Sequence, residues 1–284
     1  MTTTRSTSSP STDAHTHSGA THGFLSELFC SIQGEGLMVG ERHLFLRTAG
    51  CVATCSWCDT VYSKARTPRF VIHTDRRDGP KPWRANPVAL DDVLADVVAM
   101  ARAHAPVSTV SITGGEPLEQ PAFVRVLAQG LRAKGFRIYL ETAGLHAEAL
   151  ASLIDQVDVI AADVKLASAT GVDHRNAHRG FLRAWRGSAF DPARADARPA
   201  FVKVVVDLKA SVPEIEDAAR LVAELSRRVP FVIQPESGTL FGRRSSRADR
   251  TALLALCADG ARAATLHLDC VRVIPQTHKV LHVR

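Results

Sequence analysis

Three cysteines stand close together in one short segment, as Cys51, Cys55 and Cys58. Their C-x3-C-x2-C spacing lets a single tight loop wrap a compact inorganic core, which a helix or a strand could not do. Three thiolates can bind three irons of a [4Fe–4S] cube and leave the fourth iron open to another ligand. The spacing therefore predicts a redox cofactor held in a loop, around which the rest of the chain must fold.

Two plainer interpretations compete with the cluster. A structural zinc site would need a fourth ligand at matching spacing, and unrelated buried cysteines would need no partner at all. The remaining cysteines are isolated, and no second C-x2-C pair exists: they are Cys30, Cys257 and Cys270. Their spacing favours neither a zinc site nor a disulfide framework, and the thiols suit a reducing compartment.

Composition narrows the function classes. With 284 residues, 45% of them hydrophobic, the chain can bury one large core. The formal charge of +6 invites a nucleic-acid partner, but the arginines are scattered and aromatic residues make up only 6%. No apolar run approaches the ~20 residues of a membrane span, and the N-terminus does not resemble a secretory signal. We expect a cytoplasmic protein with no nucleic-acid and no membrane partner.

Residues 1–22 are rich in Thr, Ser, His and Gly, with almost nothing apolar. They predict a disordered tail, because such a segment cannot offset the entropy of ordering. A single domain is expected over residues 23–284. The histidines His15, His17 and His22 could bind a metal weakly, although a solvated tail explains them as well.

Apolar segments alternate between strand-like and helix-like patterns. Strands are expected at 43–47, 107–112, 136–140, 157–162, 201–207, 231–233 and 265–268. Helices are expected at 90–104, from 123 to Gly135, after a capping box at Ser211 and Glu214, and around 253–260. Residues 64–89 are interpreted as an excursion, with Trp83 as a packing anchor. The alternation implies a parallel sheet with too few units for a closed eight-fold barrel, so we predict an incomplete (partial) α/β barrel.

Polar or glycine-rich residues follow several of the expected strands. In α/β folds, ligands bind at the carboxyl ends of the strands. These segments are therefore candidate site residues: Thr113-Gly114-Gly115-Glu116-Pro117, Glu141-Thr142-Ala143-Gly144, Asp163-Val164-Lys165 and Gln234-Pro235-Glu236.

Longer motifs make a resemblance specific. The segments S-I-Q-G-E-G (31–36), F-L-R-T-A-G-C (45–51), C-S-W-C-D-T (55–60) and P-Q-T-H-K (275–279) resemble the 7-carboxy-7-deazaguanine synthase family of radical S-adenosylmethionine (SAM) enzymes. The likeness is almost unbroken over residues 29–62 and continues in order to the C-terminus. The cysteine loop is common to many radical SAM enzymes, whereas Gln-Gly-Glu-Gly and Asp-Thr are more discriminating.

The resemblance implies a ring contraction of 6-carboxy-5,6,7,8-tetrahydropterin to 7-carboxy-7-deazaguanine with loss of ammonia, as in queuosine-type 7-deazapurine biosynthesis. It implies a cluster that splits SAM into methionine and a 5′-deoxyadenosyl radical, which takes hydrogen from the pterin. It also implies Mg²⁺, an external electron donor such as flavodoxin or ferredoxin, and a possible homodimer. The cluster's chemistry belongs to the cofactor, and the protein binds and orients.

The resemblance also assigns residues to each ligand. Cys51, Cys55 and Cys58 would hold the cluster and Thr60 the Mg²⁺ ion. SAM would contact Trp57, Asp59, Gly115, Glu116, Thr142, Asp163, Lys165 and Gln234. The pterin would contact Ile32, Gln33, Gly34, Glu35, Arg47, Thr113, His278 and the terminal carboxylate of Arg284. The Asp163-Val164 pair departs from the Ser-Pro that often precedes this lysine in the family.

Two other functions remain open at this point. A radical SAM activase, which makes a glycyl radical on a partner protein, would need the same cysteines and a docking face. A non-enzymatic metal-binding protein would need only the cysteines. Residues 168–200 contain six arginines with little periodicity, and their pattern indicates no more than a solvated helix or lid.

Overall fold

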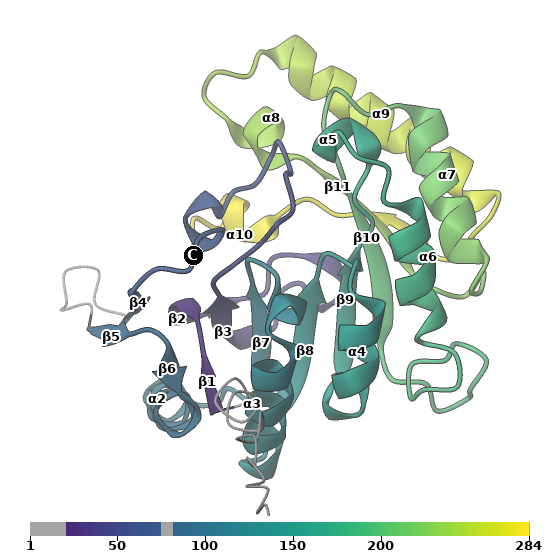
Figure 1. Ribbon diagram of the computed structural model, residues 1–284. Helices are drawn as coiled ribbons and strands as arrows, with labels where there is room; N and C mark the ends of the chain where they lie inside the picture. Colours follow the sequence, from purple (N-terminus) through teal and green to yellow (C-terminus); the bar gives the residue numbers. More distant parts are fainter. Residues whose placement is uncertain (1–20, 75–81, 284) are drawn as a thin grey trace, which may run out of the picture.

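A computed structural model describes residues 21–74 and 82–283. Its main sheet has the strand order β12-β11-β10-β9-β8-β7-β3-β2-β4-β5, and the sheet ends at two unpaired edges among the described residues (Figure 1). The strands are β2 (Leu25–Ile32), β3 (Arg42–Thr48), β4 (Arg69–Ile72), β5 (Trp83–Ala85), β7 (Thr109–Gly114), β8 (Arg137–Thr142), β9 (Val159–Asp163), β10 (Ala200–Val206), β11 (Phe231–Pro235) and β12 (Val271–Val273).

Each neighbouring pair from β3 to β12 is parallel, whereas β2 is antiparallel to β3. The predicted incomplete α/β barrel is therefore confirmed, with a hairpin at one side. A separate two-stranded sheet joins β1 (His22–Gly23) to β6 (Val88–Ala89).

Helices cover the outer side of the sheet (Figure 1). Consecutive members of this layer contact one another: α2 (Leu90–Ala103), α3 (Pro121–Ala133), α4 (Ala147–Leu153), α6 (Arg175–Arg183), α7 (Val212–Ala223) and α9 (Arg247–Thr265). Three shorter helices lie toward the opening of the partial barrel: α5 (Ala167–Thr170), α8 (Ser237–Phe241) and α10 (Thr277–Val280). No described helix is both long and apolar enough to cross a bilayer.

The central strands bury both of their faces. In β8, Ile138 and Leu140 pack in the main core with the helices, whereas Tyr139 points to the opposite face. There it joins a second apolar cluster that includes Phe201 and Val232. Because side chains alternate along a strand, burial on both faces requires near-continuous apolar segments. This is the pattern that made these strands visible in the sequence.

The predictions for residues 64–89 were incomplete. This segment contains β4 and β5, and its Trp83 is 52% exposed rather than a packing anchor. The guanidinium of Arg69 lies 4.6 Å from the centre of the Trp83 ring. Strand β5 is a short edge strand, and polar residues are common in such strands, so its composition hid it.

The C-terminal third holds two further corrections. Helix α9 continues to Thr265, and the strand expected at 265–268 lies at Val271–Val273 instead. Gly260 does not end the helix: a Cβ added there would meet the side chain of Ile215 at 2.7 Å. Gly260 instead lets α9 approach α7 closely, as a glycine without a side chain can.

The capping box predicted at α7 is only half formed. The Ser211 hydroxyl accepts a hydrogen bond from the Glu214 backbone N–H, but the Glu214 carboxylate accepts one from the Ser168 backbone N–H. A complete capping box begins α9, where Ser246 and Asp249 cap each other.

Several predictions fall outside the described residues. Of the expected disordered tail, 1–22, residues 1–20 lie outside the described residues, and these include His15 and His17. His22 pairs in β1 and so belongs with the folded part. Arg284 also lies outside the described residues. The division into a tail and one domain stays a prediction.

Candidate active site

A cavity of about 630 Å³ opens at the carboxyl ends of the parallel strands. Its volume is typical of sites that bind small molecules and cofactors. Strands β7, β8, β9, β10 and β11 all contribute to its wall, together with the loop after β3. The predicted site residues that line it are Glu35, Arg47, Cys51, Cys55, Trp57, Cys58, Asp59, Thr60, Thr113, Gly115, Thr142, Asp163, Lys165 and Gln234.

The two ends of the cysteine loop are hydrogen-bonded to each other. The Gly50 N–H donates to the Ser63 carbonyl at 2.8 Å, and the Cys51 N–H donates to the Lys64 carbonyl at 3.2 Å. Gly50 has a φ of +107°, which favours glycine. A Cβ added to Gly115 would meet the Gly50 carbonyl oxygen at 2.1 Å. Gly115 is therefore required for close approach of two backbones, behind the cysteines.

The three thiols fit an iron–sulfur cube better than a single ion. Cys51, Cys55 and Cys58 are free and half-buried, and all three line the cavity. No three His, Cys, Asp or Glu side chains in residues 21–74 and 82–283 are placed to hold one metal ion. A zinc ion needs all its ligands within about 2.3 Å of one centre, whereas each thiolate of a cube binds a different iron. Burial raises the pKa of the Cys51 and Cys55 thiols.

Two buried polar atoms on the cavity wall have no hydrogen-bond partner in the described chain. They are Nε1 of Trp57 and Oε1 of Gln234. Leaving such an atom unsatisfied costs about 1–3 kcal/mol. A polar ligand such as SAM could accept a hydrogen bond from Trp57 and donate one to Gln234, so these two residues fit the cofactor.

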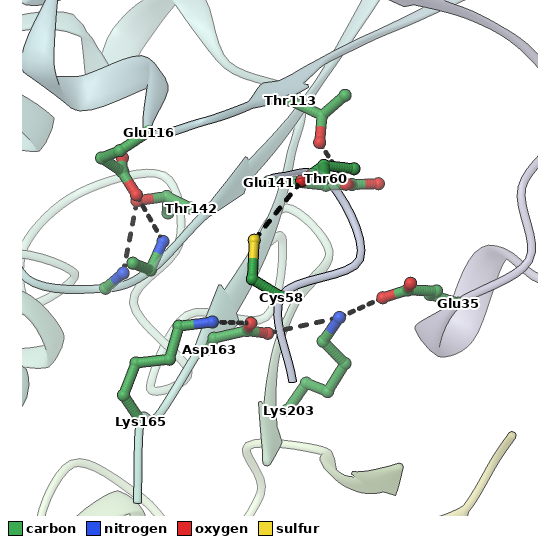
Figure 2. A network of polar contacts seen from close by, with 12 residues as sticks. Glu35, Cys58, Thr60, Thr113, Glu116, Glu141, Thr142, Asp163, Lys165 and Lys203 are labelled. Atoms are coloured by element: carbon green, nitrogen blue, oxygen red, sulfur yellow. Dashed lines mark hydrogen bonds and ion pairs between the residues drawn. The ribbon is translucent and has the colours of Figure 1, made fainter. Parts of the chain in front are cut away.

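Glu116 lies behind the cavity wall rather than in it. Its side chain is 1% exposed and accepts hydrogen bonds from the backbone N–H of Leu118 at 2.9 Å and of Ala143 at 2.6 Å. The Thr142 hydroxyl donates to the same carboxyl at 2.7 Å (Figure 2). Burial raises the pKa of Glu116. Its contacts join the end of β7 to the end of β8, and Glu116 does not line the cavity.

A chain of alternating charges crosses the cavity floor (Figure 2). Lys203 in β10 lies between Glu35, with which it forms an ion pair, and Asp163, whose carboxylate is 3.4 Å away. Asp163 also pairs with the Lys165 ammonium at 2.5 Å. Burial alone would lower the pKa of Lys203, but Asp163 and Glu35 raise it above its usual range. Burial would raise the pKa of Glu35, yet Lys203 holds it at about 2.

Arg47 is positioned by a buried carboxylate. Its Nε donates to Oε1 of Glu27 at 2.8 Å, and Glu27 also accepts from the Tyr62 hydroxyl at 2.7 Å and bonds His73 at 2.9 Å. The Arg47 side chain is 15% exposed and lines the cavity. A guanidinium presents a rigid fork of five donors, so those not used by Glu27 can reach an acidic ligand.

The loop after β2 packs tightly against the C-terminal helix α10, and this contact is called the clasp. The backbone N–H and the hydroxyl of Thr277 each donate to the Gly34 carbonyl at 2.9 Å. A Cβ added to Gly34 would meet Nδ1 of His278 at 2.1 Å. The Gln33 amide is buried and donates to Glu141 at 2.8 Å. Gln33, Gly34 and His278 therefore support Glu35 from behind, and Ile32, at the end of β2, likewise does not line the cavity.

Asp59 and Thr60 directly follow the last cysteine of the loop, and both line the cavity. The Thr60 hydroxyl faces the cavity, 3.9 Å from Sγ of Cys58. Asp59 is partly exposed and pairs with the Lys279 ammonium at 3.4 Å. An aspartate and a threonine oxygen on the cavity wall are hard ligands of the kind that Mg²⁺ prefers.

Several wall residues were not among the predicted site residues. Lys203 is one of them, since a single lysine inside an apolar strand shows no partner in the sequence. Gln276 is another: its amide donates to Glu35 and contacts Asp59 at 3.5 Å, and it accepts from the Ser237 hydroxyl. The P-Q-T-H-K motif pointed to this region, but to His278 rather than to Gln276.

Comparisons with known proteins identify similar sequences and structures. The model of the radical SAM superfamily matches residues 45–191. The 7-carboxy-7-deazaguanine synthase of Geobacter sulfurreducens is 35% identical over 90% of this chain and 96% of its own length. The synthase of Halobacterium salinarum is 30% identical over 89% of this chain and 92% of its own.

Among solved structures, QueE from Escherichia coli superposes with a TM-score of 0.54 at 21% identity, covering 90% of this chain and 94% of the other. At that identity the likeness shows the fold alone, and the fold is the same open parallel barrel. The sequence relatives show more, because they match nearly end to end. The chain belongs to the 7-carboxy-7-deazaguanine synthase family of radical SAM enzymes.

Proposed function

We propose that the protein converts 6-carboxy-5,6,7,8-tetrahydropterin to 7-carboxy-7-deazaguanine and ammonia; its relatives are named for the synthesis of this product. One observation carries the proposal. A single cavity brings the three cysteines together with a second wall that contains Arg47 and Glu35. The first wall suits an iron–sulfur cofactor, and the second offers a cation and an anion to a polar heterocycle with a carboxylate.

Cys51, Cys55 and Cys58 would hold the [4Fe–4S] cluster, which supplies the one-electron cleavage of SAM that starts the reaction. Beside it, the free Nε1 of Trp57 and Oε1 of Gln234 would satisfy polar groups of SAM. Other wall residues proposed to contact SAM are Asp59, Gly115, Thr142, Asp163 and Lys165. Glu116 is proposed to act through Thr142 and the Ala143 backbone, which it holds.

The pterin would lie against the opposite wall. Arg47 would donate to its carboxylate, because a fork of N–H groups suits a planar anion. Glu35, kept ionised by Lys203, would accept from the pterin's N–H groups. Thr113 completes this wall, and its hydroxyl donates to Glu141 at 2.6 Å. Ile32, Gln33, Gly34 and His278 would set the position of Glu35.

The protein's own contribution is to orient both ligands and to exclude water. Lys203 and Asp163 are part of a fixed array of charges that needs little reorganisation when a ligand enters. The apolar rings of Tyr139 and Phe201 form part of the cavity lining. Holding two reactants in one geometry can remove about 7–11 kcal/mol from a barrier.

We also propose that Mg²⁺ binds at Thr60. This ion commonly takes one or two protein oxygens and completes its octahedron with water and substrate. The hydroxyl of Thr60, a residue that lines the cavity, can be one such oxygen, and a carboxylated pterin can supply others. The simpler role, in which Thr60 only ends the loop, predicts no metal dependence.

A chelation experiment separates these two roles. Strong chelation of Mg²⁺ should reduce turnover of the reconstituted enzyme, and added Mg²⁺ should restore it. Thr60→Ala should raise the Mg²⁺ concentration needed for half-maximal activity by about tenfold, as loss of ~1.4 kcal/mol of binding requires. Thr67→Ala is a matched control, because the Thr67 hydroxyl donates to the Arg69 carbonyl instead. Full turnover under chelation would contradict the Mg²⁺ proposal.

The test of the reaction itself also addresses the alternative functions. Anaerobically reconstituted protein is incubated with SAM, a reductant, Mg²⁺ and the pterin, and the product and ammonia are measured. We expect both to form in equal amounts. An activase or a metal-binding protein would form neither, although an activase would still cleave SAM.

The remaining partners are proposals as well. A low-potential electron donor such as flavodoxin or ferredoxin would reduce the cluster. We also propose a homodimer and a cytoplasmic location, for which the free thiols suit a reducing compartment.

A further inference from the structure

The segment that contains α5 and α6 supports the cofactor side of the cavity. The Ser56 N–H donates to the Ala169 carbonyl at 2.9 Å, and the Thr54 hydroxyl donates to the Thr170 carbonyl, also at 2.9 Å. Both donors lie in the cysteine loop, between Cys51 and Cys58. The middle of that loop is therefore attached to α5, in a region for which the sequence indicated no role.

One side chain of α6 makes a second attachment. His178 is 2% exposed and bonds two backbone groups, the Gly144 carbonyl and the Lys165 N–H, each at 2.9 Å. A carbonyl can only accept and a backbone N–H can only donate. Nδ1 of His178 must therefore carry the proton, and Nε2 must accept. Burial lowers the pKa of this imidazole to about 4, which agrees with the neutral form.

These two bonds tie the ends of neighbouring strands together. Gly144 follows β8, and Lys165 follows β9. The side chain of Lys165 then extends along the cavity wall, where its ammonium lies 4.7 Å from the centre of the Trp57 ring and 2.5 Å from Asp163. The backbone of Lys165 is thus fixed from behind by His178, while its cation faces the cysteine loop.

The helix that carries His178 is itself held in place. Arg179 makes two hydrogen bonds to the carboxylate of Glu224, at the end of α7, at 2.7 and 2.9 Å. Phe181 and Trp185 are buried in the main core. His178 therefore projects from a well-packed element, as a residue that positions others must.

We infer that His178 is a positioning residue for the SAM half of the active site, acting through the backbone of Lys165. The inference rests on the proposed function, because it assumes that SAM binds beside Lys165. If His178 only stabilised the fold, loss of either hydrogen bond would have a similar effect, and the affinities for SAM and for the pterin would fall together. The two bonds come from different ring atoms, so they can be removed separately.

Two amide substitutions separate them. In His178→Gln the side-chain oxygen can reach the place of Nε2 and accept from Lys165, whereas in His178→Asn the shorter amide can reach only the place of Nδ1 and donate to Gly144. The dissociation constant of radiolabelled SAM is measured by equilibrium dialysis on the cluster-loaded full chain. We expect His178→Asn to weaken SAM binding by about tenfold or more, because small misplacements in a site are costly. His178→Gln should stay within about threefold of the parent protein by the same reasoning.

Three further measurements control for folding. Iron content and the midpoint of thermal unfolding show whether the variants are intact, and the dissociation constant of the pterin should stay within about twofold. In cluster-free protein, amine labelling of Lys165, followed by peptide mass mapping, should be faster in His178→Asn than in His178→Gln. Arg175→Ala is the matched control on the same helix: it breaks only the exposed pair with Asp173 and should leave SAM affinity unchanged.

Equal effects of His178→Asn and His178→Gln on SAM affinity, or no effect of either, would overturn the inference. A loss of pterin and SAM affinity together would show a general structural role and overturn it too. If the unsubstituted protein, with its cluster, does not bind SAM, the proposed function fails instead. The two failures are thus distinguishable.

Discussion

Glu27 provides the most quantitative test of the structure. It is 2% exposed in β2 and bonds Arg47, Tyr62 and His73. Burial alone would raise the pKa of this carboxyl, but His73, Arg47 and Tyr62 together lower it from 4.5 to about 2. A difference of that size between the unfolded and folded states stabilises the fold by about 3 kcal/mol at neutral pH, at ~1.36 kcal/mol per pKa unit.

Glu27→Gln should therefore reduce the free energy of unfolding by about 3 kcal/mol at neutral pH, and the thermal midpoint by about 6–12 °C. The sign of the pH dependence follows from the lowered folded-state pKa. The contribution is complete above the unfolded value of 4.5 and disappears as the pH falls toward about 2. The difference between the parent and the variant should thus be constant from about pH 7 to pH 5 and smaller by about 1.4 kcal/mol at pH ~3.5.

Urea unfolding of cluster-free protein measures this difference. Asp196→Asn is the control, because it removes a carboxylate from the exposed pair with Arg194 and should change stability by less than about 1 kcal/mol. Glu27→Gln should also raise the KM for the pterin, since Arg47 loses the partner that holds its guanidinium. A variant as stable as the parent protein, or a deficit that does not shrink in acid, would refute the reasoning.

Two further substitutions test the cavity floor and its clasp. Lys203→Met should destabilise cluster-free protein in urea by about 3–5 kcal/mol, because it leaves Glu35 buried without its cation; unchanged stability would argue against this pairing. Gly34→Ala should displace His278 and raise the KM for the pterin by about tenfold, whereas Gly180→Ala, with its nearest contact at 3.8 Å, should not. Equal KM values for these two alanine variants would show that the close packing of Gly34 against His278 does not position the pterin site.

The sequence predicted those features that depend on local pattern. Strands β8 to β11 are buried on both faces, so their continuous apolar segments identified them as strands. The polar segments that follow these strands lie together at one edge of the sheet, as parallel topology requires. The cysteine loop and Gly115, which packs against it, were predictable because cysteine spacing and glycine pairs can be recognised within a few residues of sequence. The site residues that line the cavity came mostly from these two sources.

Features that depend on distant contacts were not predictable in the same way. Lys203 pairs with Glu35, which is 168 positions away in the chain, and nothing near Lys203 identifies that partner. Gln33 and Glu116 were assigned to ligands, but they bond protein groups behind the wall. Residue type alone does not say on which side of a loop a side chain lies. The short edge strand β5 was missed because its mixed composition resembles that of a loop.

The central claim is that SAM and the pterin occupy one cavity, with the reacting atoms within reach of each other. Incubating the reconstituted enzyme with SAM, reductant, Mg²⁺ and a pterin deuterated on its ring carbons tests it directly, with 5′-deoxyadenosine analysed by mass spectrometry. We expect 5′-deoxyadenosine to acquire deuterium from the pterin while 7-carboxy-7-deazaguanine accumulates. Cleavage of SAM to 5′-deoxyadenosine without deuterium, and without product, would contradict it.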